Sequence, residues 1–304
     1  MKNLKYKQLR KTSNLIGFSF VLEVALANFL YIFLRSKNFT GENKTIVEIL
    51  INIVSFTLPY LLLLFVLSKN FKDVVPIKKP KNNPLFYIGL GFGIETIVSV
   101  LTEYLMRFLT AKNLSSATPK ELFQYENSVG GIILYLISLS VVPALVEEFV
   151  CRGVFLGLLK PFGNKFAIFI SALMFGLMHG NVEQFISAFL IGLYMAFLTL
   201  KTESLWPAIT LHFFNNFTKG IFVVFSDLNN KDFVLSYYNI ILIVSLLSFI
   251  YLFFVNKGRV FHIKEEKSKE ISTLKKLRDF VFTPGMILFF VYVMFMFYNS
   301  FKIL

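Results

Sequence analysis

The sequence predicts an all-α fold, a polytopic transmembrane helix bundle with about 8 to 9 spans and a cytosolic N-terminus. The chain of 304 residues is 56% hydrophobic, and its mean hydropathy is +0.66, far above that of an ordinary soluble domain. Its apolar residues form runs of about 18 or more, the length that a helix needs to cross about 30 Å of hydrocarbon. Its basic residues gather between these runs, as the positive-inside rule expects.

Each apolar run is expected to be a helix, because long unbroken runs exclude the alternating strands of a membrane barrel. Basic clusters occupy alternate connections, which places the N-terminus in the cytosol and the C-terminus outside if the ninth span crosses. The predicted spans cover residues 13–34, 46–68, 84–110, 130–159, 165–180, 183–200, 204–226, 235–256 and 281–301.

The charge pattern argues against a nucleic-acid partner. The formal net charge is +13, but the basic residues flank membrane spans and do not form a binding stripe. The one cysteine, Cys151, excludes an internal disulfide framework. We expect a single integral domain over residues 1–304 in the cell membrane, with the bilayer as its surroundings and a cytosolic polar linker over residues 257–279. The oligomeric state stays open.

Ionisable residues inside a span need a reason, because each costs several kcal/mol there. They concentrate in three spans, as Glu147, Glu148, Arg152, His179 and His212. The polar amide of Asn216 lies one turn after His212 in the same span. Residues four apart share a helix face, so Glu148 and Arg152 can pair while the adjacent Glu147 points elsewhere. Read separately, the groups could be a structural ion pair, a core histidine and polar contacts between helices.

Depth links the three groups. At about 1.5 Å per helical residue, Glu147 and His179 each lie about 20 Å from the nearest cytosolic connection, and His212 lies about 12 to 18 Å deep. Three helices therefore bring their rare polar groups to one layer, as a shared water-filled cavity would require. A carboxylate and an imidazole can deprotonate water, and a second imidazole with an amide can stabilise an oxyanion. This combination suits amide hydrolysis without a covalent nucleophile.

These residues carry a resemblance to a known family. The chain contains Glu-Glu-x-x-x-Arg, then Phe-x-x-x-His from Phe175, then His-x-x-x-Asn, on successive apolar spans. It thereby resembles the CAAX protease and bacteriocin-processing family, also called CPBP or Abi, which includes the type II CAAX prenyl endopeptidases. The resemblance covers about residues 130–220, the expected catalytic core. It implies that Glu147 and His179 activate water, that His212 and Asn216 form the oxyanion hole, and that Glu148 and Arg152 brace the site.

The resulting hypothesis is an intramembrane endopeptidase acting on a membrane-associated peptide or protein, such as a CAAX-type tail or a bacteriocin or pheromone precursor. It could serve bacteriocin maturation or self-immunity. No cofactor is expected. The alternatives are a zinc-dependent version, with Glu147, His179 and His212 as ligands, a proton-coupled transporter, or an immunity protein without catalysis.

Overall fold

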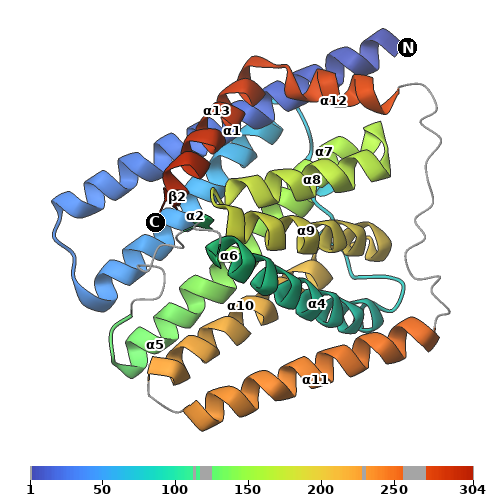
Figure 1. Cartoon of the computed structure of the whole chain (residues 1–304). Helices are drawn as coiled ribbons and strands as arrows, with labels where there is room; N and C mark the ends of the chain where they lie inside the picture. The colour runs from blue at the N-terminus through green and yellow to red at the C-terminus, as the bar shows by residue number, and fades with distance from the viewer. Residues whose placement is uncertain (1, 112–113, 117–124, 228–230, 256–271, 304) are drawn as a thin grey trace.

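Helices dominate the computed structural model of the chain, which describes residues 2–111, 114–116, 125–227, 231–255 and 272–303 (Figure 1). The α-helices are α1 (Lys2–Ser36), α2 (Gly41–Val66), α3 (Phe71–Val74), α4 (Pro84–Ala111), α5 (Val129–Leu136), α6 (Val142–Glu148), α7 (Leu156–Leu159), α8 (Asn164–Met178), α9 (Val182–Thr202), α10 (Trp206–Asp227), α11 (Lys231–Val255), α12 (Thr273–Val281) and α13 (Pro284–Ser300). Helical segments η2 (Ile137–Val141), η3 (Phe149–Phe155) and η4 (Lys160–Phe162) join α5, α6 and α7 into one continuous rod.

The all-α polytopic bundle is confirmed, whereas the expected eight to nine spans are not. Among the described residues, 6 helices are long and apolar enough to cross a membrane, or up to 7 if the bent pair of α12 and α13 counts as one span. The expected span at 165–180 is the 15-residue helix α8, too short for a full crossing. The expected span at 204–226 is α10, which is long enough but carries too many polar side chains to be one of the six. At the ninth, α13 meets α12 at a bend of 77°.

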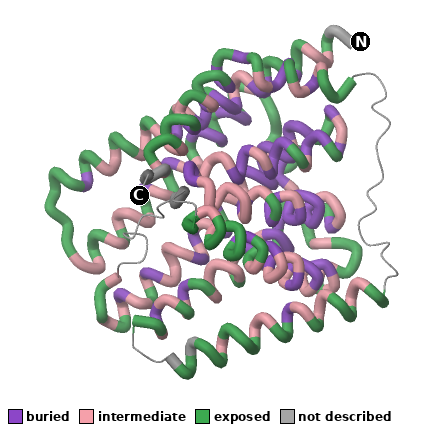
Figure 2. Tube along the Cα trace, viewed as in Figure 1, coloured by how far each residue is buried: buried purple, intermediate pink, exposed green. Residues whose placement is uncertain are grey.

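The most deeply buried part of the molecule is the rod from η3 to α7 together with α8 and α9 (Figure 2). Its apolar core includes Val150, Val154, Phe155 and Ile170, and α1 and α13 cover one side of it. The outer helix α11 is mainly exposed, and its surface side chains are Leu, Ile, Val and aromatic residues. A large exposed apolar surface of this kind indicates contact with lipid.

Several connections that the charge pattern placed on one side of the membrane do lie together. The backbone N–H of Lys81 donates to Thr202 O at 2.8 Å, and Lys81 Nζ lies 2.8 Å from Glu203 Oε2. At the chain ends, Arg10 of α1 lies 3.7 Å from Asp279 of α12. The connection before α4 and the connection after α9 therefore lie on the same face of the helix bundle. The start of α1 likewise contacts α12, which follows the polar segment.

Two local features were not foreseen from the sequence. Residues 256–271 of the expected polar linker lie outside the described residues, but the segment then forms α12, which packs against α1 and buries Asp279. A short antiparallel strand pair, β1 (Leu114–Ser116) with β2 (Phe301–Ile303), aligns Ser115 with Lys302.

The packing of α13 on α1 yields a stability prediction. The two backbones touch at Gly17 and Gly285, where a Cβ added at Gly17 would lie 2.2 Å from the carbonyl carbon of Gly285. Gly17→Val should therefore separate the helices and destabilise the protein by about 1–3 kcal/mol or more. Thermal unfolding in detergent measures the change. Ala25→Val, at an exposed position of the same helix, is the control, and equal stability of both variants would contradict the close approach.

Candidate active site

Two π-helical segments flank the short helix that carries the paired glutamates. α6 ends at Glu148, with η2 before it and η3 after it. Segments of this kind are rare and frequently occur at functional sites, because they shift the register of side chains around the helix. Pro143 adds to the irregularity, since it has no N–H to donate to the carbonyl of Leu139 four residues earlier. The rod is therefore irregular where the ionisable residues lie.

Glu148 is the centre of a buried polar network. Its Oε1 accepts a hydrogen bond from Arg152 Nη1 at 2.8 Å, and His212 Nδ1 lies 2.9 Å from the same oxygen. The side chains of Glu148 and Arg152 are fully buried. Because a carboxylate only accepts hydrogen bonds, His212 uses Nδ1 as the donor and turns Nε2 away from Glu148. The predicted pairing of Glu148 with Arg152 is thus present, and α10 is joined to it.

Arg152 is held on three sides. Its guanidinium lies 4.1 Å from the ring centroid of Phe175, and Nη2 points to the sulfur of Met195 at 3.7 Å. A planar guanidinium stacks well on an aromatic face, which a lysine could not reproduce. Phe175 also meets the rings of His179 and His212 edge to face, with centroids 5.0 and 6.0 Å away. Phe175 therefore packs against one side chain from each of the three sequence motifs, namely Arg152, His179 and His212.

Glu147 points away from this network into a cavity of about 190 Å³. Besides Glu147, the cavity is lined by His179 together with Phe56, Cys151, Phe175 and Met178. On another side of Glu147, Oε2 lies 3.8 Å from His212 Nε2. The space is large enough for several waters. Glu147 and His179 thus line one small volume, and His212 lies beside Glu147 without lining that cavity.

The contacts of His179 fix which of its nitrogens can act as a base. His179 follows the last residue of α8, and its Nδ1 lies 2.8 Å from the carbonyl oxygen of Phe175. A carbonyl oxygen only accepts, so Nδ1 carries the proton and the neutral ring keeps its lone pair on Nε2. Asn181 secures this turn, since its side chain caps α9 at Gln184 N and donates to His179 O at 3.1 Å.

Asn216 reaches the same region but uses one N–H for structure. Its Nδ2 donates to Leu139 O at 3.1 Å, the carbonyl that Pro143 leaves without its usual partner. The amide has a second N–H. The neighbouring Asn215 lines a different cavity, between α4, α10 and α11. Of these two asparagines, Asn216 is therefore the one that contacts the rod carrying the glutamates, at the carbonyl of Leu139.

The residues of the zinc alternative do not form a metal site. No group of three His, Cys, Asp or Glu side chains in the described ranges is arranged to hold a metal ion. Both imidazoles use Nδ1 for hydrogen bonds, to Glu148 and to a backbone carbonyl, so these contacts alone do not distinguish a ligand from a base at Nε2. We therefore derive no step through zinc, and the metal-free mechanism stays a prediction.

Comparison with known families agrees with this arrangement. Residues 129–218 match the family described as type II CAAX prenyl endopeptidase Rce1-like. This stretch of the chain is similar to that protease family. The match runs from the start of α5 into α10 and so contains all six predicted site residues. No curated protein and no solved structure matches the chain. The match supports a hydrolase of the protease class, and the long apolar helices support a location in a membrane.

Some neighbours of the site were not identified from the sequence. Glu23 of α1 is buried and accepts a hydrogen bond of 2.5 Å from the hydroxyl of Tyr60, whose ring packs on Phe155 of η3. The sequence signal for Glu23 was a lone acid in an apolar span, with nothing to indicate its partner. Phe56 and Met178 of the cavity wall are apolar residues among many, so no sequence signal distinguished them.

The buried ion pair gives a stability prediction with a matched control. Arg152→Met should destabilise the protein by about 3–5 kcal/mol, because it leaves the buried Glu148 carboxylate uncompensated. Arg107→Met breaks the pair with Glu103, which has the same spacing but is exposed, and should cost less than about 1 kcal/mol. Denaturant unfolding in mixed micelles compares the two. Similar losses in both variants would contradict the assigned role of burial.

Proposed function

We propose that the protein is an intramembrane endopeptidase in which Glu147 and His179 activate a water molecule to hydrolyse a peptide bond. The observation that carries the proposal is the shared cavity of Glu147 and His179, with His212 Nε2 3.8 Å from the same glutamate. The walls of this cavity are mostly apolar. In surroundings of low dielectric constant, a carboxylate and an imidazole act strongly on a bound water. The family match supports the class of reaction.

The proposed reaction proceeds in two steps. A water hydrogen-bonded to Glu147 Oε and His179 Nε2 loses a proton to them, and its oxygen adds to the peptide carbonyl carbon. The carbonyl oxygen becomes an oxyanion, which the free N–H of Asn216 and a protonated Nε2 of His212 would stabilise. The C–N bond then breaks as the proton passes to the leaving nitrogen. Glu148 and Arg152 act by fixing the orientation of His212.

The substrate class follows from the surroundings of the site. The cavity lies within a bundle whose outer surface is apolar, so the substrate must come from the membrane or its surface. Membrane-associated peptides fit this requirement, including CAAX-type tails and bacteriocin or pheromone precursors. A role in bacteriocin maturation or self-immunity belongs to the same proposal.

Replacement of the two water-activating residues tests the mechanism. Glu147→Gln and His179→Ala should each lower kcat/KM by about 10²–10⁴-fold, since each removes a group that takes the proton. The readout is cleavage of fluorogenic peptides, one with a prenylated C-terminal tail and one an unmodified apolar precursor, by protein in nanodiscs. Glu103→Gln is the control for the exposed acid. Hydrolysis that survives both substitutions would refute the roles, and solute or proton flux without any cleavage would favour a transporter.

Chelation tests the metal-free version separately. Because no metal ligand takes part in the proposed steps, treatment with 1,10-phenanthroline should leave the cleavage rate within about twofold of the untreated rate. Loss of activity that zinc restores would move Glu147, His179 and His212 to the zinc-dependent alternative.

A further inference from the structure

A second, larger cavity lies between α4, α10 and α11, separate from the cavity of Glu147 and His179. Its volume is about 380 Å³, and it is enclosed by α4, α10 and α11. Most of the wall is apolar, with Phe92, Val100, Phe222 and Leu242 among the lining residues. Cavities of this size and character, with a few polar groups, are typical ligand sites. None of the six predicted catalytic residues lines it.

The packing of α4 on α11 explains why a space exists there. Near the start of α4 the two helices touch, since a Cβ on Gly93 would lie 2.1 Å from Phe249 Cβ, and one on Gly89 would lie 3.1 Å from Leu252. Thr96 and Val100 continue the same face of α4 one and two turns later. There they line the cavity. The glycine contact therefore fixes the helices at one end, and the cavity opens beyond it.

A buried acid reaches into this space without satisfying its own hydrogen-bonding capacity. Glu95 is 7% exposed, and its Oε1 makes no hydrogen bond. Leaving such a group unpaired inside an apolar helix bundle is unfavourable by several kcal/mol. A group that brings a positive charge or a hydrogen-bond donor to Glu95 would therefore stabilise it.

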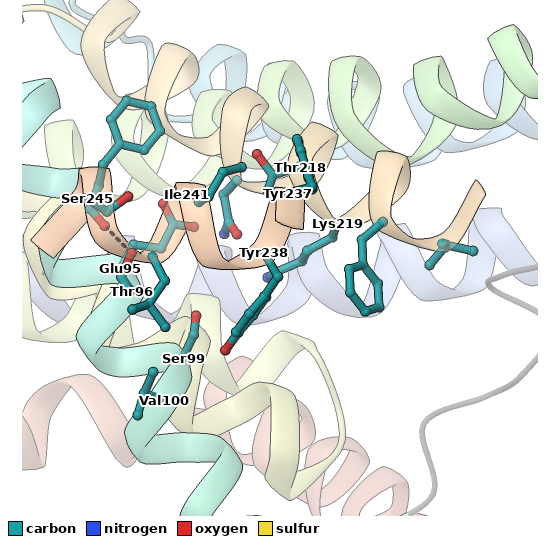
Figure 3. Close-up of a pocket in the computed structure, with 15 residues that line it drawn as sticks. Glu95, Thr96, Ser99, Val100, Thr218, Lys219, Tyr237, Tyr238, Ile241 and Ser245 are labelled. Atoms are coloured by element: carbon teal, nitrogen blue, oxygen red, sulfur yellow. Dashed lines mark hydrogen bonds between the residues drawn. The ribbon is translucent and has the colours of Figure 1, made fainter. Parts of the chain in front are cut away.

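A cation, Lys219 of α10, lines the same cavity. Its charge acts on Glu95 through space, but among the described residues no direct ion pair within 4.0 Å joins the two side chains. In Figure 3 the two side chains approach the cavity from different helices, with Tyr238 beside Lys219. Opposite charges thus face one apolar space from two walls, with room between them.

We propose that this cavity binds a zwitterionic amphiphile from the membrane. The cationic group of the ligand would pair with Glu95, its anionic group with Lys219, and its hydrocarbon chain would lie along the apolar wall. A ligand with a single charge leaves one wall unpaired and meets a like charge on it. The exposed apolar surface of α11 provides contact with the lipid phase from which the ligand enters.

Binding of three probes with the same alkyl chain tests the proposal without reference to peptidase activity. Native mass spectrometry of the full chain in maltoside micelles would measure the affinities of dodecylphosphocholine, dodecyl methyl phosphate and dodecyltrimethylammonium. The zwitterionic probe should bind at least about 10-fold more tightly than either singly charged one. Equal or tighter binding of a singly charged probe to the wild type would overturn the proposal. Binding of a zwitterionic apolar peptide, without binding of dodecylphosphocholine, would also overturn it, because the ligand would then be a peptide and not a lipid.

Variants then assign the binding to the two charges. Glu95→Gln and Lys219→Met should each weaken dodecylphosphocholine binding at least about 10-fold, whereas Glu103→Gln, an exposed acid on the same helix, should leave it unchanged. Ser99→Trp fills the cavity without altering either charge and should abolish the binding of all three probes. Wild-type affinity in Glu95→Gln or in Ser99→Trp would contradict the site, and the ranking of probes on the wild type decides the matter if a variant fails to fold.

Discussion

The arrangement of the site depends on the buried contact among Glu148, Arg152 and His212. A fully buried carboxylate and guanidinium are tolerable only when paired and further hydrogen-bonded. Here the pair closes one turn of the rod, the guanidinium stacks on Phe175 from α8, and His212 from α10 bonds the same carboxylate oxygen. One ion pair therefore joins three separate helical segments. Loss of this ion pair would release His212, whose Nε2 lies 3.8 Å from Glu147 Oε2.

The irregular backbone around Glu147 complements this rigid contact. π-helical turns before and after α6 change which side chains face inward, so that adjacent glutamates can serve different surroundings. Glu148 is sealed in the polar network, while Glu147 keeps 22% of its side chain exposed and faces the cavity. The same irregularity is stabilised from outside, because Asn216 hydrogen-bonds the carbonyl that Pro143 leaves free. The site therefore combines the buried pair of Arg152 and Glu148 with a second carboxylate, that of Glu147, which remains accessible to water.

Much of this could be predicted from the sequence, because ionisable residues are rare in apolar helices. The spacing of four between Glu148 and Arg152 predicted their pairing, and the common depth of Glu147 and His179 predicted that they lie near each other. The choice of Glu148 as the partner of His212 could not be predicted, since it depends on the rotation of α10 about its axis. The span count was not confirmed where apolar composition did not reveal helix length or direction, as in the short α8 and the 77° bend between α12 and α13. That Glu95 and Lys219 line one cavity could not be predicted either, because it depends on how α4, α10 and α11 pack.

The most direct test of the account is a high-resolution experimental structure of the protein in a lipid phase, with the waters resolved. The account predicts an ordered water in the 190 Å³ cavity, within hydrogen-bonding distance of both Glu147 and the Nε2 atom of His179. A cavity closed by packed side chains, with the carboxylate and the imidazole turned away from each other and no solvent between them, would contradict it.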